Sequence, residues 1–100
     1  MPTIENLLGV PSRLSILAFL STAQSVDFTT LKDETGLSSG NLSTHLTKLE
    51  DANLVTIDKS FRDKRPCTTI NLTDHGRNAF LDYVERMERY YSEFRKQATT

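Results

Sequence analysis

The sequence predicts one small α+β domain, built from helices and a two-stranded hairpin, and three stretches of apolar spacing support this. Between residues 11 and 52 the apolar residues follow the 3.6-residue period of helices. Between residues 54 and 72 they alternate with a period of two, as in strands, and from residue 80 they recur at intervals of four and three residues. The chain has 100 residues, of which 37% are hydrophobic, and this suits a single core. We therefore expect one domain over residues 1–100.

The N-terminal part is expected to form a short helix followed by a longer, mostly buried one. Ile4, Leu7 and Leu8 share one face of the short helix, which ends at Gly9. Pro11 begins the second helix, "PSRLSILAFLS", because proline is tolerated in a first helical turn. Apolar residues cover most of the circumference of this helix, so it should be buried on most sides.

A helix-turn-helix pattern follows a brief strand at "VDF". The segment "TTLKDETG" is typical of a short helix, because its Gly36 suits the left-handed position after the last turn. Ser38 or Ser39 caps the next helix, which should run to about residue 52. Two helices of this size, joined by a few residues that include a glycine, form a helix-turn-helix candidate.

The hairpin is expected from two short alternating stretches. "LVTIDK" places Val55 and Ile57 on one face, and "CTTINL" places Ile70 and Leu72 on one face. The segment "SFRDKRP" between them is polar and basic, which predicts a long charged tip. Thr73 then caps the last helix.

These elements, in this order, are those of a winged helix-turn-helix, and the chain resembles the short winged-helix transcriptional regulators related to the MarR and ArsR repressors. The matching stretches are "PSRLSILAFL", "FTTLKDETGLSSGNLSTHLTKLEDANLV", "RDKRP" and "INLTDHGRNAF". The resemblance implies a three-helix core with a two-stranded β wing over residues 10–72. It also implies a homodimer that binds double-stranded DNA and controls transcription. In that arrangement the helix from Asn41 to Leu49 lies in the major groove and the hairpin lies against the backbone.

The helix within "LSSGNLSTHLTKLE" has an unusual polar face. Leu42, Leu46 and Leu49 lie within a narrow arc, whereas the rest of the surface carries mostly small hydroxyl and amide side chains. Serine and threonine are mediocre helix formers, so this face suits a groove of DNA better than it serves helix stability. A plain solvent-exposed face is the alternative. The expected DNA contacts of this helix are Asn41, Ser43, Thr44 and Thr47 to base edges, Ser39 and Lys48 to phosphates, and Gly40 where the backbone approaches most closely.

A basic cluster marks the expected wing. The chain has a net charge of −1, which by itself argues against nucleic-acid binding, yet Lys59, Arg62, Lys64 and Arg65 lie within seven residues with only Asp63 opposing them. We expect Arg62, Lys64 and Arg65 to contact phosphate or the minor groove, with Asp63 orienting one of the arginines. A charged tip that only keeps the loop hydrated is the alternative.

The last helix carries an apolar seam, because Phe80, Val84, Met87, Tyr91 and Phe94 are spaced four, three, four and three residues apart. The earlier positions should pack on the domain itself, whereas the later ones would leave an apolar stripe on a monomer. Two-fold pairing buries such a stripe, so we expect residues 73–98 to be a dimerisation helix, assisted by a segment at about residues 1–9. The expected interface residues are Ile4, Leu7, Leu8, Met87, Tyr90, Tyr91 and Phe94.

Catalysis, metal binding and membrane insertion find no support in the sequence. It has no phosphate-cradling glycine loop, no H-E-x-x-H motif and no nucleophile elbow, so we expect no enzyme and no cofactor. Cys67 is the single cysteine, which excludes an internal disulfide and a zinc site and leaves a redox sensor as a minor alternative. No apolar run approaches the ~20 residues of a membrane span, and the start lacks a basic n-region, so we expect a cytoplasmic protein.

Three side chains near the helix-turn-helix have less specific expectations. His45 lies close to the leucine arc, so it should pack against the domain and not read bases. Arg13 and Lys32 either touch the DNA backbone or interact within the protein. Whether a small-molecule effector exists is open.

Two functions of different kinds remain. The first is a dimeric, sequence-specific DNA-binding transcriptional regulator that represses by occluding a promoter. The second is a winged helix that serves as a protein-interaction module in a larger assembly and binds no DNA. The net charge favours the second, whereas the polar helix face and the basic wing favour the first.

Overall fold

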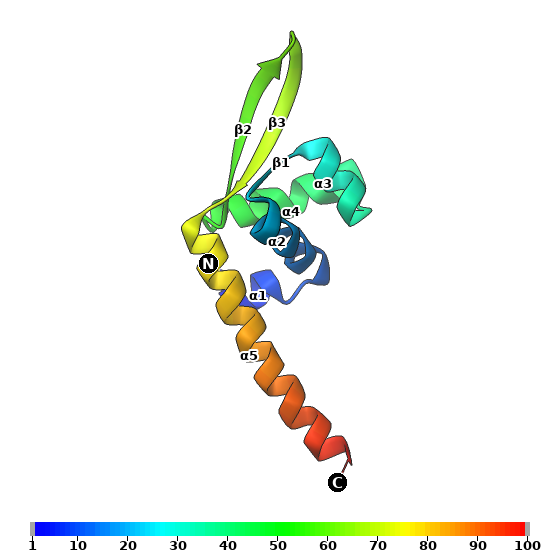
Figure 1. Ribbon diagram of the computed structural model, residues 1–100, viewed down its shortest axis with the longest axis vertical. Coiled ribbons are helices and arrows are strands. Elements are labelled where there is room, and N and C mark those ends of the chain that lie inside the picture. The colour runs from blue at the N-terminus through cyan, green and yellow to red at the C-terminus, as the bar shows by residue number, and fades with distance from the viewer. Residues whose placement is uncertain (1, 100) are drawn as a thin grey trace.

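The computed structural model describes residues 2–99 and contains the predicted elements in the predicted order (Figure 1). Within these residues the elements are α1 (Ile4–Leu8), α2 (Pro11–Ala23), β1 (Ser25–Asp27), α3 (Phe28–Thr35), α4 (Ser39–Asp51), β2 (Val55–Arg62), β3 (Arg65–Leu72) and α5 (Asp74–Thr99). The first four helices form a body, from which the β2–β3 hairpin projects at one end and α5 at the other, so the molecule measures 61 × 24 × 24 Å. This is the winged helix fold with a long C-terminal helix. Among the described residues, no helix combines the length and the apolar character needed to cross a membrane.

Local signals in the sequence set the ends of the helices. The Thr3 hydroxyl accepts a hydrogen bond from the backbone N–H of Asn6 at 3.1 Å and so caps α1. The Ser38 hydroxyl does the same for α4, accepting from the Asn41 N–H at 3.2 Å. Gly36 ends α3 in the left-handed conformation, with φ of 71°, as its position in the sequence predicts.

The three strands form an antiparallel sheet in the order β1-β3-β2. The tip is charged as predicted, but the expected long loop is wrong, because both strands of the hairpin continue until Arg62 faces Arg65. Only Asp63 and Lys64 make the turn, with φ of 51° and 66°, the pair of positive angles that a type I′ hairpin turn needs. Near the tip the side chains on both faces of the hairpin are exposed, so the sequence there does not alternate between apolar and polar residues. The alternation therefore predicts shorter strands than the backbone pairing forms.

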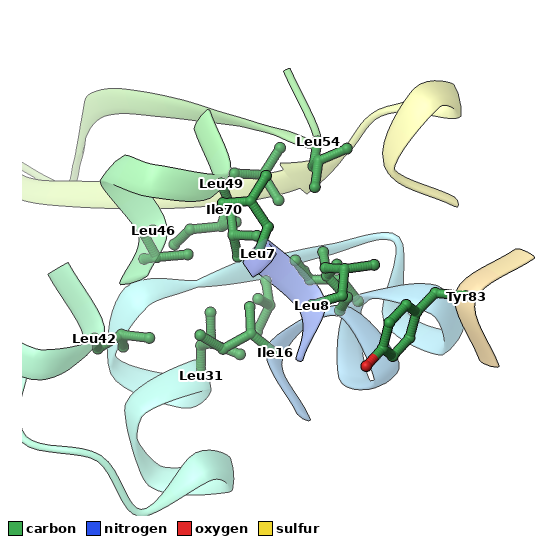
Figure 2. Close-up of a cluster of buried hydrophobic side chains, with 14 residues drawn as sticks. Leu7, Leu8, Ile16, Leu31, Leu42, Leu46, Leu49, Leu54, Ile70 and Tyr83 are labelled. Atoms are coloured by element: carbon green, nitrogen blue, oxygen red, sulfur yellow. The ribbon is translucent and has the colours of Figure 1, made fainter. Parts of the chain in front are cut away.

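A single apolar core joins the helices to the sheet (Figure 2). Leu42, Leu46 and Leu49 attach α4 to this core, as the narrow leucine arc predicts. Leu7 and Leu8 of α1 also lie inside it, with 2% and 0% of their surfaces exposed. The expectation that these two leucines contact a second copy is therefore wrong, because their own domain already covers them. The apolar residues of a short helix have the same spacing in the sequence whether they pack against their own chain or against a second copy.

The junction between β3 and α5 is fixed by Thr73 and Gly76. The Thr73 hydroxyl accepts from the Gly76 N–H at 2.8 Å, which confirms its predicted capping role, and donates to the Asn53 carbonyl oxygen at 2.7 Å. Gly76 is required here, since a Cβ at this position would lie 2.0 Å from the Leu54 carbonyl oxygen. These contacts hold the start of α5 against the base of the wing.

Candidate nucleic-acid interface

The polar face of α4 is the best-defined candidate surface for nucleic acid. The leucines on the opposite side are buried, so the helix is held by that side and presents the other to solvent. All the residues of α4 that the sequence analysis expected to contact DNA are exposed in the structure. They are Ser39, Gly40, Asn41, Ser43, Thr44, Thr47 and Lys48.

Two hydroxyl groups on this face have a defined orientation. The Thr44 Oγ1 donates to the Gly40 carbonyl oxygen at 3.0 Å, and the Thr47 Oγ1 donates to the Ser43 carbonyl oxygen at 2.9 Å. Because each hydroxyl proton is used inside the helix, these side chains offer an outside partner an acceptor oxygen and a methyl group. In a major groove, the acceptor suits the amino group of adenine or cytosine, and the methyl suits the thymine methyl.

The N-terminal turn of α4 is open to close approach. A Cβ at Gly40 would meet no atom within 4 Å beyond its chain neighbours and the nearby backbone of its own helix, so the fold itself does not require glycine at this position. The Ser38 hydroxyl already binds the Asn41 N–H, whereas the N–H groups of Ser39 and Gly40 point out of the first turn. Such free amides at the positive end of a helix favour a phosphate group.

The wing presents a cationic tip. Arg62, Lys64 and Arg65 are all exposed, and the two arginines form a directly opposed cross-strand pair. Like charges in that position repel each other, so an added anion would stabilise the tip. Within residues 2–99 the ion pairs are those of Arg86 with Glu5 and Asp82, and of Lys96 with Glu93. The expected orienting pair between Asp63 and an arginine is therefore wrong for this structure, because Asp63 forms none of these ion pairs.

A cleft separates the polar face of α4 from the wing. It encloses about 320 Å³ and is lined on the helix side by Ser43 and Thr47 and on the hairpin side by Lys59 and Thr68. Sequence reasoning counted Lys59 in the basic cluster but assigned it no contact, and it missed Thr68. The two residues face each other across the hairpin, and that register is visible only once the turn is known.

His45 and Arg13 hold α4 against α2 and α1. The Arg13 Nε donates to His45 Nδ1 at 3.2 Å, and an Arg13 amino group donates to the Leu7 carbonyl oxygen at 3.2 Å. Burial lowers the pKa of His45 below its ordinary value, and the charges of Arg13 and Lys48 lower it further. His45 therefore packs within the domain, as expected, and of the two roles left open for Arg13 the structure shows the internal one.

A second candidate surface lies on the outer part of α5. Tyr90, Tyr91 and Phe94 are 52%, 59% and 56% exposed, and the Phe94 ring lies with its centroid 6.3 Å from each tyrosine ring. Met87 instead packs partly against the domain core. Arg86 forms an ion pair with Glu5 that joins α5 to α1. The exposed apolar stripe is therefore shorter than the sequence predicted and lies nearer the end of the helix.

Residues 2–99 contain no group of three or more His, Cys, Asp and Glu side chains that could hold a metal ion. Cys67 is a free thiol of intermediate burial on β3.

Comparison with known proteins gives a consistent result. Residues 12–91 match the family described as the winged helix DNA-binding domain. Over 72 residues the chain is 40% identical to an uncharacterized protein of Methanocaldococcus jannaschii, and the match covers 72% of this chain and 78% of that protein. The structure is similar to that of a transcriptional regulator homologue from Pyrococcus horikoshii, with 30% identity, 88% and 87% of the two chains covered, and a TM-score of 0.83. A mutant MarR of E. coli, solved in complex with operator DNA, shares the fold with a TM-score of 0.64 at 21% identity, over 72% of this chain and 51% of that one.

Proposed function

Because the chain belongs to the winged helix DNA-binding domain family, we propose that it acts as a homodimeric repressor, which binds a specific duplex sequence and blocks a promoter. Membership of this family of transcriptional regulators makes the chain a DNA-binding regulator and not an enzyme. The dimer, the repression and the individual DNA contacts are the proposal. Among the related structures, the E. coli MarR was solved on its operator DNA, which supports this use of the fold.

The polar face of α4 carries the proposal. From Ser39 to Lys48 this helix has no acidic side chain, so this stretch does not repel a phosphate backbone. Asn41 is exposed near its N-terminus, and an asparagine amide can pair with adenine through two hydrogen bonds. Thr44 and Thr47 add acceptor oxygens and methyl groups at the next turns. In this proposal α4 reads bases in the major groove.

The basic side chains of the wing supply affinity without base selection. Arg62, Lys64 and Arg65 are exposed cations without an ion-pair partner in the described part of the chain. Contacts of such groups with phosphates release counterions and contribute to binding on any sequence. In this proposal the wing positions the protein on the backbone and α4 selects the sequence.

The outer part of α5 supports the dimer. Three exposed aromatic rings, those of Tyr90, Tyr91 and Phe94, form a stripe that a second α5 would cover. A hollow of about 260 Å³ lies beside this stripe, against Leu14 and Tyr83, and could receive part of the partner helix. Two-fold symmetry then implies two half-sites about one helical turn, ~10 bp, apart.

The separate roles of helix and wing can be tested with one set of titrations. Duplexes that bind the protein are first selected from a randomised pool. Asn41→Ala and Thr44→Ala should each cost ~1–3 kcal/mol on the selected duplex and much less on random duplex, because base contacts act only on the right sequence. Arg62→Ala should weaken binding to both duplexes and reduce the salt slope by about one, because one fewer counterion is released.

Ser92→Ala, on the exposed polar side of α5, serves as the matched control and should bind like the unmodified protein. If the helix and wing variants behave alike on both duplexes at every salt concentration, the division of roles is wrong.

A protein-interaction module is the second candidate, because the chain has a net charge of −1 where nucleic-acid-binding domains are commonly basic. A mobility-shift titration against random duplex at low salt separates the two functions. Binding there supports the regulator, and its complete absence supports the interaction module.

A further inference from the structure

Phe61 is the most exposed large apolar residue of residues 2–99, with 76% of its surface open to solvent. It lies on β2, one residue before the basic tip of the wing, and its cross-strand partner is Pro66. An isolated apolar side chain on a surface is common, but a phenylalanine beside a proline and two arginines is a mixed apolar and cationic surface.

The register of the hairpin shows which side of the wing Phe61 occupies. Alternate residues of a strand share a face, so Phe61 lies on the face of Lys59 and Ile57. Ile57 is paired with Ile70 in the core, and Lys59 lines the cleft opposite α4. This face therefore runs outward from the core, passes the cleft beside α4 and reaches Phe61 near the tip. Figure 1 shows how far the hairpin projects from the body.

The length of the wing fits the spacing of DNA grooves. At ~3.3 Å per residue, Phe61 lies ~13 Å beyond Ile57, and the arginine pair at the tip lies ~17 Å beyond it. One turn of duplex DNA spans ~34 Å, so a minor groove follows a major groove after ~17 Å on the same side of the duplex. When α4 occupies a major groove, the end of the wing reaches the next minor groove.

We propose that Phe61 enters this minor groove as an apolar wedge, partly unstacking one base step, while Arg62 and Arg65 hold the neighbouring phosphates. Apolar side chains inserted from the minor-groove side kink DNA and select steps that unstack easily, such as TA and CA/TG. Phe61 would thus add sequence preference outside the bases that α4 reads. The inference depends on the proposed DNA binding, and the cationic neighbours favour DNA over an apolar protein partner as the occupant.

The test uses the full-length protein and the duplex selected from the randomised pool. In a set of otherwise identical duplexes, one adenine at a time in the flanking segments is replaced by 2-aminopurine, whose fluorescence rises when the base unstacks. The variants are Phe61→Ala, which removes the ring, Phe61→Leu, which keeps an apolar wedge, and Arg62→Ala as the charge control.

The unmodified protein should raise the fluorescence at one flanking step in each half-site. Phe61→Ala should abolish this rise and weaken binding about tenfold, with the salt slope unchanged because no charge is lost. Phe61→Leu should retain most of both effects. Arg62→Ala should keep the fluorescence rise and lower the salt slope by about one.

Unaltered affinity of Phe61→Ala, or an unaltered fluorescence rise, overturns the wedge while leaving the regulator proposal intact. Self-association of the free protein that disappears in Phe61→Ala also overturns it, because Phe61 would then be a protein contact. Failure of the unmodified protein to bind any duplex overturns the regulator proposal itself, and the wedge with it.

Discussion

At the scale of single residues, the glycines of α4 and α5 have different reasons to lack a side chain. Gly76 cannot carry a Cβ, because that atom would lie 2.0 Å from the Leu54 carbonyl oxygen. Gly40 could carry one, because the space around it is open, and glycine in a helix is less stable than alanine. The fold therefore explains Gly76 but gives no reason for Gly40, and the proposed close approach of DNA to α4 would supply one.

Gly40→Ala should consequently raise stability and lower DNA affinity together. The added methyl group should increase the free energy of unfolding by up to ~1 kcal/mol, because alanine is the better helix former. It should also keep the backbone of α4 away from the duplex. Urea unfolding and binding to the selected duplex measure the two effects. Ser92→Ala on α5 is the control, since it should stabilise slightly without changing DNA binding, and tighter binding by Gly40→Ala would contradict a close approach.

The bond between Arg13 and His45 makes part of the stability depend on pH. Nδ1 of His45 can accept from Arg13 only while it carries no proton, and burial together with the charges of Arg13 and Lys48 lowers the pKa of His45 from its ordinary 6.5. The unfolded chain therefore binds the proton more readily than the folded one. The contribution of His45 is complete above about pH 6.5 and is lost as the pH falls through the lowered pKa.

Comparison of the unmodified protein with His45→Gln by urea unfolding between pH 7.5 and 5 measures this contribution. The unmodified protein should lose stability more steeply on the acid side of pH 6.5, so the difference between the two proteins should shrink there. Parallel pH profiles for the two proteins would exclude His45 as the responsible group.

At the scale of elements, α5 serves two purposes along its length. Its first half packs on the domain through Tyr83, and its second half continues past the body (Figure 1). Tyr90, Tyr91 and Phe94 on this second half are exposed. Twenty-six residues give a helix ~39 Å long, more than this small domain can cover. The exposed half therefore has apolar surface available for a second copy.

Substitutions at two adjacent positions of α5 can test this pairing. Tyr91 lies on the apolar stripe, whereas Ser92, about 100° further around the helix, is exposed on the polar side, so Tyr91→Glu and Ser92→Glu add the same charge inside and outside the stripe. Tyr91→Glu should raise the dimer dissociation constant at least about tenfold, because it would bury an unpaired carboxylate in an apolar interface. Ser92→Glu should leave it unchanged. Sedimentation velocity at micromolar concentration measures both, and a monomeric unmodified protein would exclude the dimer.

At the scale of the whole molecule, shape and charge separate the two surfaces. The wing and α5 project from opposite ends of a molecule 61 Å long, so the proposed DNA contact at one end and the proposed pairing at the other would not compete (Figure 1). The net charge of −1 is also misleading as an average, because Lys59, Arg62, Lys64 and Arg65 are concentrated at the wing. A local concentration of cations determines phosphate binding more than the total does.

The sequence alone determined the fold, the order of the elements and most of their ends. Helical and strand periods differ, and the signals at Gly36, Ser38 and Thr73 act over three or four residues, so both can be read without a structure. The exposed face of α4 could also be predicted from the sequence, because the leucines of this helix mark its buried side and the remaining residues must point away from the core.

Only the tertiary structure decided which partner each of those surfaces has. Leu7 and Leu8 proved to lie in the domain core, Arg13 to bind His45, and Phe61 to share a wing face with the cleft beside α4. The length of the wing strands was also decided there, since backbone pairing and not apolar alternation extends them to Arg62 and Arg65. The physical reason is that the spacing of apolar residues shows which side chains will be buried but not what buries them. The residues that bury them lie far apart in the chain and come together only in the folded structure.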